Sequence, residues 1–135
     1  MIRAALVLAL SFAGCGSDDQ GVKRAQPEAR GHVVLYVSNQ SFERSTVDIR
    51  IEVDGREVVS DGFAVENQHN WVEYRLRLTR GTHVIRAESA AGEAAFERSF
   101  EIRGRTWAVV DYWCCDGPGE PRFTFHLSRE PIGFA

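Results

Sequence analysis

The sequence lacks the long apolar run that a membrane-spanning helix requires. Its apolar stretch, residues 4–13, is much shorter than the roughly 20 residues that cross a bilayer. The sequence also lacks runs of like charge, and 16 basic and 19 acidic residues give a formal net charge of −3 over 135 residues. A mildly acidic chain with dispersed charge has no electrostatic footprint for nucleic acid, nor a polybasic segment for a membrane surface. We therefore expect no transmembrane helix and no nucleic-acid partner.

Motifs of catalysis and metal binding are also missing. There is no G-x-S-x-G segment. The histidines lie on four separate segments, without the short spacings of a local chelate: His32, His69, His83 and His126. A serine–histidine–aspartate set could be assembled from Ser38, His126 and Asp111, but many other sets would serve equally well. The loop at 116–120 holds only two carboxylates, without the alternating oxygen ligands of a calcium loop. We expect neither a catalytic residue nor a cofactor.

What the sequence does have is a distinctive amino terminus. One cation, Arg3, precedes the apolar stretch, and the small pair Ala13-Gly14 stands directly before Cys15. This order is typical of a secretory signal with a small-residue cleavage site. The segment from Phe12 to Cys15 resembles the lipobox of bacterial lipoproteins, although Phe12 stands where that family usually carries Leu. The alternative is an ordinary secretory signal that ends near a cysteine.

The lipoprotein resemblance implies that the peptide before Cys15 is removed and that Cys15 is acylated. Several acyl chains give the stable attachment that a single chain does not. The membrane is then the first partner of the protein, which would lie in the cell envelope, at the outer membrane or at the outer face of the plasma membrane. Gly16, rather than Asp, after the cysteine resembles lipoproteins that are sent on to the outer membrane.

The chain divides into three parts on this interpretation. Residues 1–14 form the lipoprotein signal peptide. Residues 15–31 comprise the lipidated cysteine and a polar linker without hydrophobic period, which is expected to be a flexible tether. Residues 32–135 are one domain, long enough to bury a core.

Within that domain, apolar and polar residues alternate with a period of two. The clearest example is 47–53, which is followed at once by Asp54-Gly55, the dipeptide of a type I′ hairpin turn. Similar segments predict further strands at 33–38, 56–59, 71–78, 82–89, 96–102, 106–113 and 123–128. Short alternating strands separated by turn signals predict an all-β, antiparallel sandwich of seven or eight strands. The segment Arg80 to Glu88 resembles the penultimate hairpin of immunoglobulin-like and transthyretin-like accessory domains of secreted bacterial proteins, which implies the same fold class.

The adjacent cysteines Cys114 and Cys115 allow three interpretations. The first is two free thiols, one packed in the core and one near the surface, which the spacing favours. The second is a redox-labile disulfide, because a ring closed between neighbouring residues is strained and easily reduced. The third is a soft-metal site completed by His126, although zinc sites usually space their cysteines by two to four residues.

Aromatic residues suggest a binding face. Trp71 is out of phase with the apolar residues of its strand and shares a face with Arg75, so the two could stack on a sugar ring or hold a peptide. Tyr112 could extend this surface. The alternative is that these faces are buried between the sheets or under a loop.

Two further placements follow from strand phase. Arg98 falls in the core phase of its strand, and Asp111 is in phase with Trp107 and Trp113, so we expect a buried Arg98–Asp111 pair. The apolar residues of the C-terminal run, Ile132 and Phe134, are expected to dock onto the domain's own sheet rather than onto a partner.

Two functions remain open at this point. The first is a membrane-anchored, non-catalytic binding or assembly module that holds an envelope protein or a glycan. The second is a redox or soft-metal-handling lipoprotein centred on Cys114 and Cys115. The first is favoured because no titratable groups converge on one motif.

Overall fold

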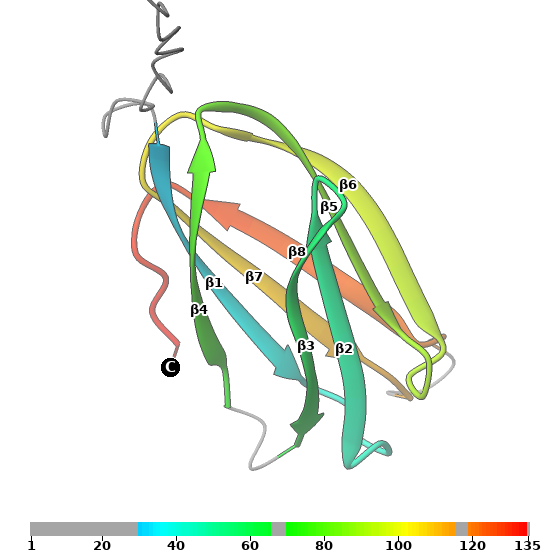
Figure 1. Cartoon of the computed structure of the whole chain (residues 1–135). Helices are drawn as coiled ribbons and strands as arrows, with labels where there is room; N and C mark the ends of the chain where they lie inside the picture. The colour runs from blue at the N-terminus through cyan, green and yellow to red at the C-terminus, as the bar shows by residue number, and fades with distance from the viewer. Residues whose placement is uncertain (1–29, 66–69, 116–118, 135) are drawn as a thin grey trace, which may run out of the picture.

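The computed structural model describes residues 30–65, 70–115 and 119–134, and within them the chain is all-β, as predicted. The eight strands are β1 (Arg30–Asn39), β2 (Thr46–Val53), β3 (Arg56–Ala64), β4 (Val72–Thr79), β5 (Gly81–Ser89), β6 (Ala94–Ile102), β7 (Thr106–Trp113) and β8 (Arg122–Ser128). They form two four-stranded sheets, in the orders β4-β1-β7-β8 and β3-β2-β5-β6 (Figure 1). The described part of the chain holds no helix long and apolar enough to span a membrane.

One pairing differs from the expected antiparallel arrangement. β1 pairs with β7 in parallel, from Val33 opposite Thr106 to Asn39 opposite Tyr112. Its other neighbour, β4, is antiparallel to it. The alternation that marks a strand gives no information about its direction, so this pairing follows only from how the chain passes between the two sheets.

The predicted turn after β2 is confirmed. Asp54 and Gly55 have φ angles of 50° and 75°, as a type I′ hairpin requires. β3 runs on to Ala64 and remains paired with β2 over that length, with one irregularity in the register between Ile51 and Glu52. The strand predicted at 56–59 is thus the first part of a longer strand.

The core lies between the sheets and is built from the inward residues of both. In β2 the buried and open positions alternate along the whole strand, as its sequence predicts. The largest fully buried apolar side chains are Tyr112, Leu35, Ile49, Ile51, Ile102, Val37, Val47 and Val110. These bulky, mostly β-branched residues fit the pleated inner surfaces of two packed sheets.

The expected buried pair of Arg98 and Asp111 is wrong. Arg98 is exposed at the surface of β6. The inward face of β7 is the opposite phase, which includes Ala108 and Val110, so Asp111 points away from the core. Both phases of β7 carry apolar residues, and Val109 of the outer phase is itself buried, so the pattern did not distinguish the inner face.

Candidate functional site

The outer surface of the sheet β4-β1-β7-β8, which we call the outer face, carries the aromatic residues that the sequence singled out. Strand register arranges its side chains in rows. Val34 lies between Arg75 of β4 and Trp107 of β7, and Ser38 lies opposite Asp111. Trp71 lies at the start of this sheet, immediately before β4. The outer face therefore changes along β1 from arginine-rich rows to a row with a tryptophan and a carboxylate.

Asp111 is the centre of that last row. One of its oxygens, Oδ1, accepts hydrogen bonds from Ser38 Oγ at 2.6 Å and from Trp71 Nε1 at 3.0 Å. Gln40 Nε2 in turn donates to Ser38 Oγ at 2.9 Å. Burial raises the pKa of Asp111, and the bonds from Ser38 and Trp71 only partly oppose this rise. A half-buried carboxylate with a raised pKa, held by a tryptophan on a sheet surface, marks a functional candidate.

The polar segment after β1 fixes the geometry of this row. Ser38, Asn39, Gln40 and Ser41 are all buried. Asn39 Nδ2 donates to the carbonyl oxygens of Arg44 and Phe63, each at 3.0 Å. The backbone N–H of Gln40 donates to the Tyr112 carbonyl oxygen at 2.8 Å. These bonds satisfy the buried polar groups and hold Ser38 against Asp111. Sequence reasoning missed this network, and its only signal was a polar run directly after an apolar strand.

The C-terminal segment covers part of the outer face. Phe134 stacks on Trp71 with ring centroids 3.9 Å apart and meets Tyr36 edge-on at 5.0 Å. After β8 the segment turns back along the sheet toward β1 and β4 (Figure 1). The expectation that Phe134 docks on its own domain is confirmed, and the residue lies over the outer face of the sheet. Phe134 keeps 38% of its surface exposed, so the cover is shallow.

The three residues expected to form a binding face are only partly brought together. Trp71 and Arg75 share the outer face, where Arg75 is exposed and pairs with Glu73 at 2.7 Å. Tyr112 lies on the other side of the sheet, fully buried, with its hydroxyl donating to the Gly92 carbonyl at 2.8 Å. Tyr112 is therefore a core residue, because the inward phase of β7 includes position 112.

The adjacent cysteines are joined as a disulfide at the end of β7. Cys114 is completely buried, whereas Cys115 is partly open and has a positive φ of 69°. His126 is exposed on β8, opposite Val109. In the described segments, no three His, Cys, Asp or Glu side chains lie where they could share a metal ion.

The residues of the hypothetical serine–histidine–aspartate set are not assembled. Ser38 binds Asp111 directly, so the serine donates to the carboxylate with no imidazole between them. Among the described histidines the buried one is His83, whose two ring nitrogens lie 2.6 Å from Asp54 Oδ2 and 2.7 Å from the Thr79 carbonyl oxygen. Burial opposes protonation of His83, but these two acceptors outweigh it and raise its pKa. His83 ties the β2–β3 turn to the end of β4 and is remote from the outer-face row.

The opposite sheet presents a different kind of surface. On β3-β2-β5-β6, Arg50 is paired with Glu52 at 2.5 Å, Glu57 at 2.8 Å and Glu88 at 3.3 Å. Exposed charges that compensate one another in this way are typical of a solvated surface. Trp71, Phe134 and the half-buried Asp111 lie at the other sheet.

Comparison of the sequence with protein-family models and with curated proteins finds no match.

Proposed function

We propose that this protein is a lipid-anchored, non-catalytic binding module of the cell envelope, and that the outer face is its binding surface. The observation that carries the proposal is the row of Trp71, Ser38 and Asp111 under the shallow cover of Phe134. Trp71 offers a flat apolar ring whose orientation is fixed by its bond to Asp111, which is the kind of anchor that dominates binding surfaces. A glycan ring or an aromatic side chain of an envelope protein would stack there in place of Phe134.

The membrane half of the proposal rests on the lipobox-like segment that ends in Cys15. The expected product is a chain that begins at an acylated Cys15, and intact-mass analysis of the protein purified from membranes would detect the acyl groups. Cys15→Ser should remove the added mass of the acyl groups and release the domain from the membrane fraction. A chain that keeps its leader, or that is cleaved without acylation, would overturn the anchor.

The binding half is tested on Trp71. The protein is cross-linked in cells through a photoreactive residue at position 75, and the retained envelope protein or glycan is identified. Trp71→Ala should lose this product, because the stacking surface is gone. Trp113→Ala is the matched control, since Trp113 is a partly buried tryptophan of the same outer face whose Nε1 donates to Thr124 Oγ1 at 3.2 Å. Equal retention by both variants would exclude Trp71 as the anchor.

A redox function is the second candidate, favoured by the disulfide between Cys114 and Cys115. In such a reaction the disulfide would accept two electrons and two protons from a partner dithiol, which would itself become a disulfide. The double variant Cys114→Ser, Cys115→Ser should abolish that exchange while the fold remains. If the purified protein instead contains two free thiols, this candidate is withdrawn, and the binding module is unaffected.

A further inference from the structure

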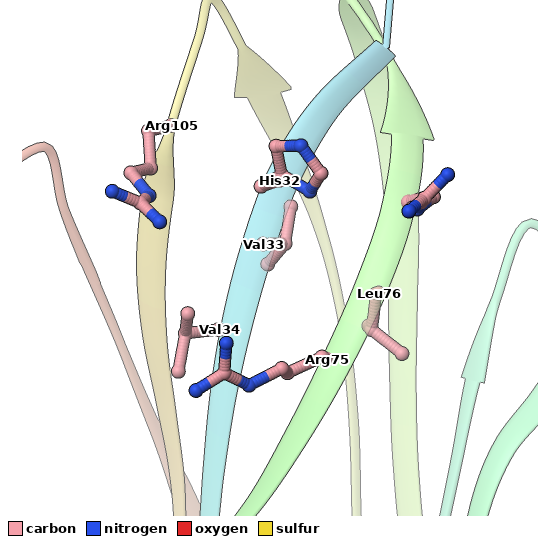
Figure 2. Close-up of a pocket in the computed structure, with 7 residues that line it drawn as sticks. His32, Val33, Val34, Arg75, Leu76 and Arg105 are labelled. Carbon is pink, nitrogen blue, oxygen red and sulfur yellow. The ribbon is translucent and has the colours of Figure 1, made fainter.

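The outer face contains a hollow toward the end of the sheet where β1 begins, and Arg75 lies on the side of it that faces the row of Trp71 and Asp111. It has a volume of about 260 Å³ and lies across β4 and β1 as far as Arg105, the residue before β7. Its polar lining is entirely basic or imidazole: His32, Arg75, Arg77 and Arg105. Figure 2 shows Arg75 extending from β4 across β1 beside Val34, with Arg105 on the β7 side of His32.

The sheet register explains why these residues gather although the sequence has no basic run. His32 is the partner of Arg77, and Arg105 directly precedes Thr106, the partner of Val33. Three segments far apart in the chain thus each place a cationic or titratable group in one row of the sheet. Half-buried Val34 lies in the next row, between Arg75 and Trp107.

The charge of this hollow is largely uncompensated. Arg75 is paired with Glu73, the nearest acidic residue on its strand. Arg105 lies 5.7 Å from the centre of the Trp107 ring, a contact that leaves its positive charge intact. Within the described residues, no ion pair involves Arg77 or Arg105, in contrast to the self-compensated Arg50 cluster on the other sheet.

A second hollow of about 410 Å³ adjoins the first at the same end of the fold. It shares Arg105 and adds Arg103 and Arg129, with Glu101 as its acidic residue. Glu101 is paired with Arg103 at 2.8 Å. A chain with a net charge of −3 thus gathers several arginines at one end, of which Arg77 and Arg105 have no ion pair among the described residues.

We infer that the hollow of His32, Arg75, Arg77 and Arg105 binds the phosphate group of an anionic phospholipid. Guanidinium groups match phosphate oxygens in geometry and charge, and Val34 and Trp107 supply apolar surface beside them. The inference rests on the proposed membrane anchor for the choice of a lipid over free phosphate. Cys15 precedes Arg30, the first residue of β1, by 15 residues, and a chain of that length spans at most about 50 Å. The arginine-rich end is thus within reach of the membrane surface that holds Cys15.

The test uses the full chain purified in a non-ionic, phosphate-free detergent, with backbone amide resonances followed by NMR. It is titrated separately with phosphatidylglycerol, phosphatidylcholine and inorganic phosphate. We expect saturable shifts at Val34, Arg77 and Arg105 with phosphatidylglycerol and much weaker ones with the zwitterionic lipid. Shifts with inorganic phosphate but not with phosphatidylglycerol would identify free phosphate as the ligand and overturn the inference that the ligand is a lipid. Absence of shifts with all three would overturn the site.

Charge variants separate this site from general attraction. Each arginine near an anionic surface contributes about fivefold to binding, so Arg77→Gln with Arg105→Gln should weaken the phosphatidylglycerol affinity about 25-fold. The control is Arg56→Gln with Arg98→Gln, which removes the same charge from exposed positions of the other sheet. An equal loss in the control would overturn the hollow as the binding site.

The same sample distinguishes this inference from the proposed anchor. Its intact mass reports whether Cys15 is acylated, independently of the titration. An unacylated chain that still binds phosphatidylglycerol would refute the anchor and leave the hollow standing. An acylated chain with no lipid-dependent shifts would refute the hollow as a lipid site and leave the anchor standing.

Discussion

At the scale of single residues, Asp111 is the residue whose ionisation most clearly lowers the stability of the fold. Its pKa is raised by burial despite the hydrogen bonds from Ser38 and Trp71. The folded state therefore holds the proton more tightly than the unfolded chain, whose aspartates titrate near pH 3.9. The contribution of Asp111 to the free energy of unfolding therefore falls as the pH rises from about 4 through the raised pKa, and this loss is complete above it. A residue that costs stability at neutral pH is easier to understand as part of a binding surface than as a structural element.

We predict that Asp111→Asn stabilises the protein at pH 7, since the amide oxygen can still accept from Ser38 and Trp71 without carrying charge. The difference in free energy of unfolding between the variant and the natural protein should grow as the pH rises from 4 to 8. Urea unfolding at a series of pH values measures it, and titration of His83 and Asp54 cancels in the difference. Asp61→Asn, at an exposed position of β3, is the control. A difference that does not change with pH would show that folding does not raise the pKa of Asp111.

At the scale of elements, amphipathic strands could be predicted from the sequence and doubly covered ones could not. β2 alternates along its whole length because one of its faces is in the core and the other in solvent. β7 has apolar residues in both phases, since the core covers one side while Val109 on the other side is only 6% exposed. Period-two reasoning therefore predicts that β7 is a strand but cannot choose its inner face, which is why Tyr112 and Asp111 were both misplaced.

The candidate site was predictable only in part for a related reason. Trp71 and Arg75 share a strand phase and were found together, whereas Ser38, Asp111 and Phe134 come from distant segments. Their contacts depend on the parallel pairing of β1 with β7 and on the return of the C-terminal segment across the sheet. Neither arrangement leaves a local pattern in the sequence.

The C-terminal segment gives the prediction at this scale. Phe134→Ala removes the stacked ring from Trp71, so the unfolding free energy should fall by about 0.5–1.5 kcal/mol. Tryptophan emission should shift to the red, because Trp71 becomes more exposed to water. Phe42→Ala is the control, since Phe42 is 59% exposed in the loop after β1. Unchanged emission in the Phe134 variant would mean that the segment does not cover Trp71 in solution.

At the scale of the whole molecule, the two sheets have one shared core but different outer surfaces. The sheet β3-β2-β5-β6 presents compensated ion pairs around Arg50, and the sheet β4-β1-β7-β8 presents arginines at one end and aromatic residues at the other. The only disulfide among the described residues joins neighbours, so it closes no long loop and adds little to the global stability. Cohesion of the two sheets must therefore come from packing between their inner faces.

β1 is where that packing should matter most. It lies between β4 and β7 in its own sheet, and its Leu35 points into the core with 1% of its surface exposed. We predict that Leu35→Ala lowers the free energy of unfolding by about 2–5 kcal/mol, because a cavity is left that rigid neighbouring strands cannot fill. Leu127→Ala, on β8 at 36% exposure, should cost much less. Urea unfolding followed by far-UV circular dichroism and by tryptophan fluorescence measures both variants.

The two probes should give one transition, since the tryptophans report on β4-β1-β7-β8 while circular dichroism reports on both sheets. Separate transitions would show that the sheets unfold independently and that the interface between them is not the main source of stability.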